Sequence, residues 1–191
     1  MIMKCFRHKQ NKSRRHLLTL IEAMLSLSAA TLVTAAVIPA ATSMLNAAKE
    51  ARVQMELNAI SAGLAEYARD VGYFPGVSPT TAQDGNHLVL ATDAPIPQGE
   101  TPQWTEAHRL SLRQYLCFQG ADAEPSWSGP YLNTSINDDP WGNAYVINIS
   151  AARGGAVFAL SAGRNGQIDT PFEQLVSNAA VGGDDYAVRL Q

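Results

Sequence analysis

The strongest constraint on the fold is an apolar run near the N-terminus. From Leu17 to Ala48 the only ionisable side chain is Glu22, and the 26 residues from Ala23 to Ala48 carry no charge. A helix of about 20 apolar residues spans the hydrocarbon core of a bilayer. The run is therefore long enough to cross a membrane, and any account of the chain has to say what surrounds it.

Charge is distributed unevenly about this run. Residues 1–16 hold six of the 14 Lys and Arg and no acid, whereas the remainder holds 8 basic and 17 acidic residues, a net charge of -9. Basic residues flanking a membrane segment stay on the cytoplasmic side. We therefore expect a cytoplasmic N-terminus and an acidic body outside. A body of this sign repels phosphates, so no nucleic-acid partner is expected.

Three interpretations of the run compete. It is a cleaved secretory signal with Ala-rich sites such as Ala35-Ala36-Val37, a plain single-span anchor, or a segment with a function of its own. The third follows from Glu22, because a carboxylate inside an apolar membrane helix is costly and calls for a partner. A simpler reading is a tolerated carboxylate near the membrane interface that reaches back toward Arg14 or Arg15.

Helical periodicity continues beyond the apolar run. Apolar residues recur at spacings of three and four, with charged residues between them, which is typical of a helix with one buried stripe. We predict one helix from Leu18 to Val71, about 80 Å long at 1.5 Å per residue, and ended by Gly72 as a left-handed cap. The stripe consists of Val53, Leu57, Ile60, Leu64, Tyr67 and Val71.

The start of this helix resembles a known signal. Leu18-Thr19-Leu20-Ile21-Glu22, followed by Pro39, resembles the class III signal of type IV pilins and type II secretion pseudopilins, although Leu17 stands where the family has glycine. The resemblance implies cleavage between Leu17 and Leu18 by prepilin peptidase, methylation of the new amine, and pairing of Glu22 with the amine of an adjacent subunit. Pro39 matches the helix-kinking proline of many pilins.

Two further segments strengthen the resemblance. Gly129-Pro130-Tyr131-Leu132 and the stretch from Asp138 to Tyr145 look like the major pseudopilin of type II secretion (general secretion pathway protein G), and the resemblance covers residues 17–75 and 127–190. It implies an α+β, pilin-like fold in which the long helix packs on a small antiparallel sheet. The expected divisions are a basic leader (1–17), a transmembrane and assembly helix (18–48), its amphipathic outer half (49–74), a variable loop with a short helix (75–126), and the sheet with the C-terminal loop (127–191).

Local signals predict the elements of the body. A short strand is expected at residues 87–91, and a helix from Thr105 as N-cap to Phe118. The turn at residues 139–143 should bury Trp141 in the core. Alternating apolar residues at 145–150 and 156–161 predict a β-hairpin.

Oxygen-rich loops after this hairpin suggest a calcium site, because a hard cation binds carboxylates and carbonyls. The related pseudopilins hold calcium there. By position, Asp184 and Asp185 match the family's acidic pair, Asn165 replaces an aspartate, and Asp169 could compensate for it. The carbonyls of Leu160 and Ser161 complete the implied set. The alternative is that these are ordinary turn residues.

No catalytic motif is present: the chain has no GxxxxGK, HExxH or CxxC, and its histidines are isolated. We therefore expect no enzyme. The resemblance implies a structural subunit in the inner membrane and a periplasmic filament, with copies of itself, other pseudopilins, the inner-membrane assembly platform, prepilin peptidase and membrane lipid as partners. Alternatives are a type IV pilus or minor pilin subunit for adhesion or DNA uptake, and an exported soluble binding domain with a cleaved signal peptide.

Overall fold

The computed structural model describes residues 19–77, 88–119, 124–133 and 136–191, without the side chains of residues 29–37. Its contacts separate two compact units, which divide between Leu45 and Asn46. Helix α1 (Leu20–Val71) belongs to both. The basic leader and the Leu17–Leu18 processing site lie outside the described residues.

Helix α1 agrees closely with the prediction from periodicity. It is continuous over 52 residues, includes Pro39, and ends where the amide of Gly72 donates to the carbonyl of Ala68 at 2.9 Å. Gly72 has a φ of 94°, the left-handed conformation in which glycine is least strained. No helix in the described part of the chain meets the length and hydropathy required of a membrane span.

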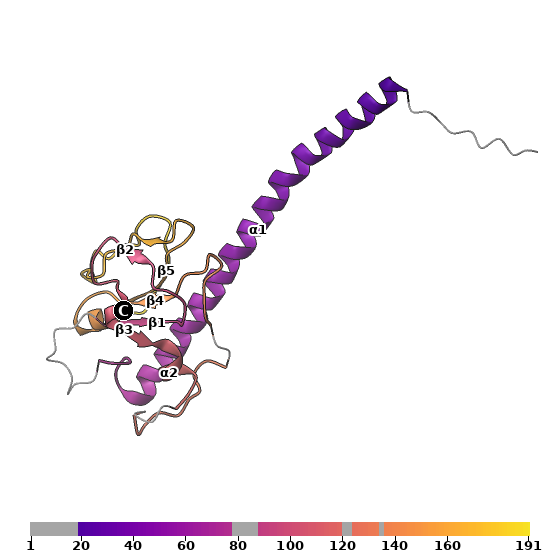
Figure 1. Cartoon of the computed structure of the whole chain (residues 1–191). Coiled ribbons are helices and arrows are strands. Elements are labelled where there is room, and N and C mark those ends of the chain that lie inside the picture. The colour runs from indigo at the N-terminus through magenta and orange to yellow at the C-terminus, as the bar shows by residue number, and fades with distance from the viewer. Residues whose placement is uncertain (1–18, 78–87, 120–123, 134–135) are drawn as a thin grey trace, which may run out of the picture. The chain divides into compact units, whose positions relative to one another are not determined.

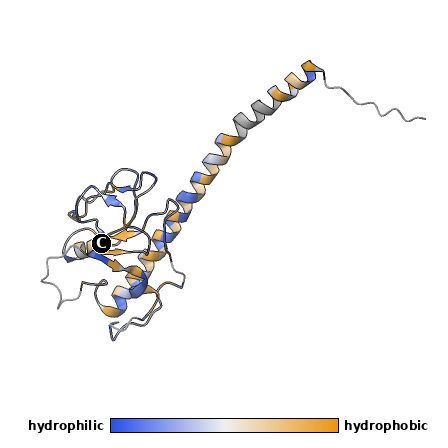
Figure 2. Cartoon of the chain, viewed as in Figure 1, coloured by the Kyte–Doolittle hydropathy of each residue, from blue (hydrophilic) through white to orange (hydrophobic). Residues whose placement is uncertain are grey.

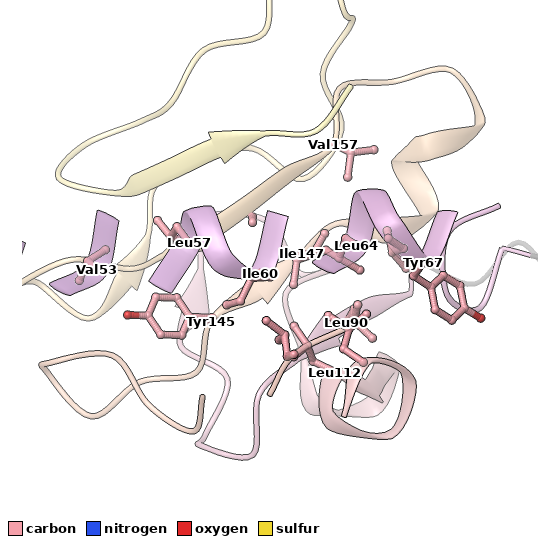
Figure 3. Close-up of a cluster of buried hydrophobic side chains, with 14 residues drawn as sticks. Val53, Leu57, Ile60, Leu64, Tyr67, Leu90, Leu112, Tyr145, Ile147 and Val157 are labelled. Carbon is pink, nitrogen blue, oxygen red and sulfur yellow. The ribbon is translucent and has the colours of Figure 1, made fainter. Parts of the chain in front are cut away.

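The predicted stripe forms the first of two cores. Five of its six residues are at most 2% exposed, and Val71 is partly buried. They pack against apolar side chains of the sheet, including Leu90, Tyr145 and Ile147, as Figure 3 shows. The helix is therefore fixed to the sheet by its outer half, as its one-sided apolar pattern requires.

The sheet has five strands in the order β3-β1-β4-β5-β7. Of these, β1, β3, β4 and β5 are labelled in Figure 1. Its central strands are the most hydrophobic part of the body (Figure 2). A separate two-stranded sheet pairs β2 with β6. The strands are β1 (Val89–Ala91), β2 (Gln98–Gly99), β3 (Arg109–Ser111), β4 (Val146–Ile147), β5 (Phe158–Ser161), β6 (Gln167–Ile168) and β7 (Tyr186–Arg189).

The α+β, pilin-like fold is confirmed, with one change to the sheet. The pairs β1–β4, β4–β5 and β5–β7 are antiparallel as expected, but β1 and β3 run parallel. The main sheet is therefore mixed and not purely antiparallel. The connection that makes β3 parallel to β1 passes through residues 92–108, the part of the chain with the fewest sequence signals.

The helix predicted from Thr105 to Phe118 is wrong as a single element. Thr105 does cap a helical turn, the 3₁₀ helix η1 (Glu106–His108), but strand β3 follows, and α2 spans only Leu112–Leu116. The interruption has a tertiary cause. Strand β3 pairs with β1, and the Arg109 guanidinium donates to the carbonyls of Thr92 and Ala94, so sheet contacts override local helix propensity.

The predicted hairpin is confirmed with a longer connection. Strand β4 pairs with β5 in the register Val146 to Leu160, and the 3₁₀ helix η2 (Ile149–Arg153) lies between them. Gly154 ends η2 with a φ of 146°.

Trp141 occupies a different position from the one expected. It is half-buried, and its ring is stacked on Tyr186 with ring centroids 5.8 Å apart. The tryptophan that fills a core is Trp104, at 4% exposure. Trp104 belongs to a second core, which contains no residue of the helix stripe. Its other members include Val89, Val146, Phe158, Leu160, Ile168 and Phe172.

Candidate functional site

Two regions carry the predicted functional residues, and the first is the start of helix α1. The hydroxyl of Thr19 accepts from the amide of Glu22 at 3.3 Å. In return the Glu22 carboxylate accepts from the Thr19 amide at 2.9 Å and from its hydroxyl at 3.0 Å. This reciprocal pair is a capping box, which satisfies amides that lack an intrahelical partner.

The capping role of Glu22 was missed in the sequence, although Thr-x-x-Glu before an apolar helix is its signature. Glu22 therefore acts within its own chain. The carboxylate remains exposed, so this role is compatible with a contact to another subunit. The two roles differ chemically: capping needs an acceptor oxygen, and pairing with an amine needs a negative charge.

The described side chains of the first unit expose large apolar surface. Each residue in question has between 60% and 76% of its surface open to solvent. Large apolar residues exposed to this extent mark a site of contact with protein or lipid. The exposed residues are Leu20, Ile21, Met24, Leu25, Leu27, Ile38, Met44 and Leu45.

Pro39 lies within this half of the helix without ending it. Proline has no amide hydrogen, so it removes one intrahelical hydrogen bond. Nearby, the hydroxyl of Thr42 donates to the Pro39 carbonyl at 2.9 Å. Helix α1 therefore continues through Pro39, the residue that matches the proline of many pilins.

The second region is the C-terminal loop, which we define as residues 162–170 and 182–185. Strand β5 leads into it, and its last residues Leu160 and Ser161 pair with Ala187 and Tyr186 of β7. The Ser161 hydroxyl donates to the buried carboxylate of Asp139 at 2.7 Å. Leu160 and Ser161, whose carbonyls are predicted to bind the cation, therefore lie directly before the loop.

Asp184 and Asn165 maintain the shape of this loop. One oxygen of the Asp184 carboxylate accepts from the amides of Arg164 and Asn165, at 2.9 and 3.1 Å. The Asn165 side chain donates to Asp169 at 2.9 Å and accepts from the Gln167 amide at 2.7 Å. Asn165 thus turns its amide nitrogen, not its oxygen, toward the Asp169 carboxylate.

Asp185 has the most unusual environment of the predicted ligands. Its Oδ2 accepts from the amide and hydroxyl of Thr170 at 2.8 and 2.6 Å, while its Oδ1 is buried without a hydrogen-bond partner. Burial raises the pKa of Asp185 to about 6, and the negative charge of Asp169 adds to the rise despite the Thr170 hydrogen bonds. A bound cation would supply the compensation that this carboxylate lacks.

The predicted ligand set is therefore only partly brought together. Asp185 fits a hard cation because of its unsatisfied buried oxygen, and Asp169 lies close enough to perturb it electrostatically. Asp184 and Asn165 are engaged in holding the loop. Across the described residues, no three acidic, histidine or cysteine side chains are grouped as metal ligands.

The sequence also did not predict how the C-terminal loop is tied to helix α1. The Arg164 guanidinium forms an ion pair of 2.7 Å with Glu50, both half-exposed. One residue along, the Lys49 ammonium lies 5.8 Å from the centre of the Trp141 ring. Exposed ion pairs contribute little free energy, so we expect the Arg164–Glu50 pair to add little to the stability of the subunit.

Comparison with known families gives one result. Residues 110–178 match the family model described as "Type II secretion system (T2SS), protein G". The match includes the segments at residues 129–132 and 138–145 that carried the predicted resemblance in the body, and it ends before Asp184 and Asp185. Neither curated proteins nor solved structures gave a match.

Proposed function

We propose that this chain is a type II secretion pseudopilin whose copies assemble through helix α1 into a pseudopilus, because residues 110–178 match the model of the type II secretion system protein G family. The family is that of the major pseudopilin, so the predicted resemblance is confirmed. The chain is a structural subunit and not an enzyme, and it works with other components of the secretion system.

One observation carries the proposal of assembly through the helix. Helix α1 changes character along its length: between Val53 and Tyr67 it buries a stripe against the sheet, whereas its described side chains up to Leu45 expose large apolar surface. An apolar helix face gains stability only when lipid or protein covers it. Lipid before assembly and neighbouring subunits afterwards would both cover it.

The remaining expectations refine this assignment. The chain would insert once in the inner membrane with its basic leader in the cytoplasm and its body in the periplasm. Prepilin peptidase would cut between Leu17 and Leu18, and the assembly platform would extract the subunit into the filament. Supporting these steps are the charge asymmetry and the Thr19 to Glu22 signal.

The role of Glu22 is tested with two variants of the full chain. Glu22→Gln keeps an acceptor oxygen for the Thr19 amide and removes the charge, and Glu22→Ala removes both. If the charge pairs with a neighbouring amine, both variants insert in the membrane and yield few or no pseudopili, scored by electron microscopy of cells overproducing the protein. Normal filaments from Glu22→Gln together with loss in Glu22→Ala would reduce Glu22 to a capping residue.

We further propose that a calcium ion binds the C-terminal loop and stabilises the folded subunit. Asp185 and Asp169 would hold it, with the carbonyls of Leu160 and Ser161 as further oxygen donors, and Asp184 and Asn165 would shape the loop. Support comes from the buried, unpartnered oxygen of Asp185. Calcium should raise the melting temperature of wild type and leave that of Asp185→Ala unchanged. Equal melting of wild type with calcium and with a chelator rejects the site.

A further inference from the structure

We propose that residues 92–105, called here the clamp segment, hold the C-terminal loop in its folded position independently of any bound cation. Trp104 is the positioning residue of this clamp. The clamp segment acts on the same loop as the proposed calcium ion, but it does so only through contacts within the chain.

Backbone pairing provides the first contact between the two segments. Strand β2 of the clamp segment pairs in parallel with β6 of the loop, in the register Gln98 to Gln167 and Gly99 to Ile168. The amide of Glu100 extends the pairing by donating to the Ile168 carbonyl at 2.9 Å. These hydrogen bonds join residues about seventy positions apart in the chain, so they fix one segment against the other.

Trp104 provides the second contact. Its indole is 4% exposed, and its Nε1 donates to the carbonyl of Thr170 at 3.1 Å. Its ring meets the ring of Phe172 edge to face, with centroids 4.8 Å apart. A buried aromatic side chain with its polar atom satisfied is a strong anchor, because it combines apolar burial with a directional bond.

Gly99 shows how closely the clamp is fitted. A Cβ atom at this position would overlap the side chain of Trp104. The strand therefore passes directly over the indole, and only glycine allows this approach. The clamp segment and its tryptophan form one packed unit.

Thr170 links the clamp to the acidic end of the loop. Its carbonyl accepts from Trp104, while its amide and hydroxyl donate to the carboxylate of Asp185. The same hydroxyl accepts from the amide of Gly182 at 3.0 Å. Trp104 therefore positions Asp185 through Thr170, and with it the turn that begins at Gly182.

Hydrogen exchange of the full chain in detergent micelles with a chelator tests the clamp. In wild type, the amides of Glu100, Thr170 and Gly182 should be protected, because each donates a hydrogen bond to a residue of the C-terminal loop. In Trp104→Ala their exchange should accelerate by about tenfold or more, while the helix stripe at residues 53–67 stays protected. Trp127→Ala is the matched control, since this half-buried indole donates to Tyr115 and lies in the other core.

A milder variant guards against global unfolding. Trp104→Phe keeps a buried aromatic ring, although a smaller one, and removes the indole donor to Thr170, so faster exchange should be confined to residues 168–172 and 182–185. Unchanged exchange at these amides in both Trp104 variants would overturn the proposal. So would free exchange of the wild-type loop in chelator followed by protection when calcium is added.

The outcomes separate this proposal from the calcium proposal. A wild-type loop that is protected in chelator, with no thermal shift on adding calcium, removes the cation and leaves the clamp. A loop that is protected only when calcium is present rejects the clamp and supports the calcium site. Protection in chelator together with a calcium-dependent thermal shift supports both, as binding to a loop already in place.

Discussion

Asp139 shows at the residue scale how a single buried carboxylate organises a turn. It is 1% exposed, and its Oδ1 accepts from the amides of Trp141 and Asn143 at 3.0 and 2.9 Å. Its Oδ2 accepts from the Ser161 hydroxyl. The turn that precedes β4 is thereby tied to the end of β5, next to the C-terminal loop.

Replacing Asp139 should therefore destabilise the subunit. Asp139→Ala leaves two part-buried amides and the buried Ser161 hydroxyl without their acceptor, and we expect a loss of about 2–4 kcal/mol in the free energy of unfolding. Asp139→Asn keeps an acceptor for the amides and should lose about 1 kcal/mol. Urea unfolding of the two variants measures the difference, and equal stability of Asp139→Ala and wild type would contradict this role.

The raised pKa of Asp185 should make the free energy of unfolding depend on pH. Its pKa rises from 3.8 to about 6 in the folded chain, so between these values the folded state binds more protons than the unfolded state. The free energy of unfolding should therefore fall as pH rises from about 4 to about 6, and Asp185→Asn should lack this component. Thermal melting of both proteins in chelator across this range measures it. A wild-type profile that matches the variant would show that the carboxylate is not perturbed.

A bound calcium ion would reverse the sign for Asp185. The cation favours the ionised carboxylate and lowers its pKa, so the stability that calcium contributes is present at neutral pH and lost as the carboxylate is protonated. The same melting experiment with calcium therefore distinguishes a bare loop from an occupied one.

At the scale of the element, helix α1 has faces with different tasks. Leu57 is fully buried against the sheet, whereas Met55, two positions earlier, is 66% exposed. Leu57→Ala should cost about 3 kcal/mol because it leaves a cavity in the core. Met55→Ala should change the stability of the subunit by less than about 0.5 kcal/mol. Similar losses in both variants, measured by chemical unfolding, would mean that the helix packs by a different face.

Elements set by local chemistry were predictable from the sequence. The spacing of Val53 to Val71 predicted the buried stripe, Gly72 predicted the helix end, and alternation predicted the hairpin of β4 and β5. The capping box of Thr19 and Glu22 was equally readable and was missed.

Elements set by distant contacts were not predictable. Residues 109–111 form a strand only because β1 lies beside them, and β2 forms only against β6. The candidate site divides in the same way: its aspartates were found by position, but the bond from Thr170 to Asp185, and the bond from the distant Trp104 to Thr170, depend on the fold. A propensity in the sequence is weak beside such pairings.

At the scale of the whole molecule, the sheet separates two tasks. One core joins it to the outer half of helix α1, and the other joins it to the clamp segment and the C-terminal loop. Each element is therefore anchored to the sheet by its own side chains. The apolar start of α1 is left for lipid or other subunits, which is the arrangement that a filament subunit requires.

The claim that copies assemble through the start of helix α1 is tested most directly by photo-cross-linking at Met24, which is 64% exposed. The full chain, with a photo-reactive amino acid in place of Met24, is produced in cells that contain the other secretion components and is irradiated. The account predicts a ladder of covalent dimers and higher multiples of the subunit. If protein that carries the photo-reactive residue yields only monomer after irradiation, the proposed assembly is contradicted.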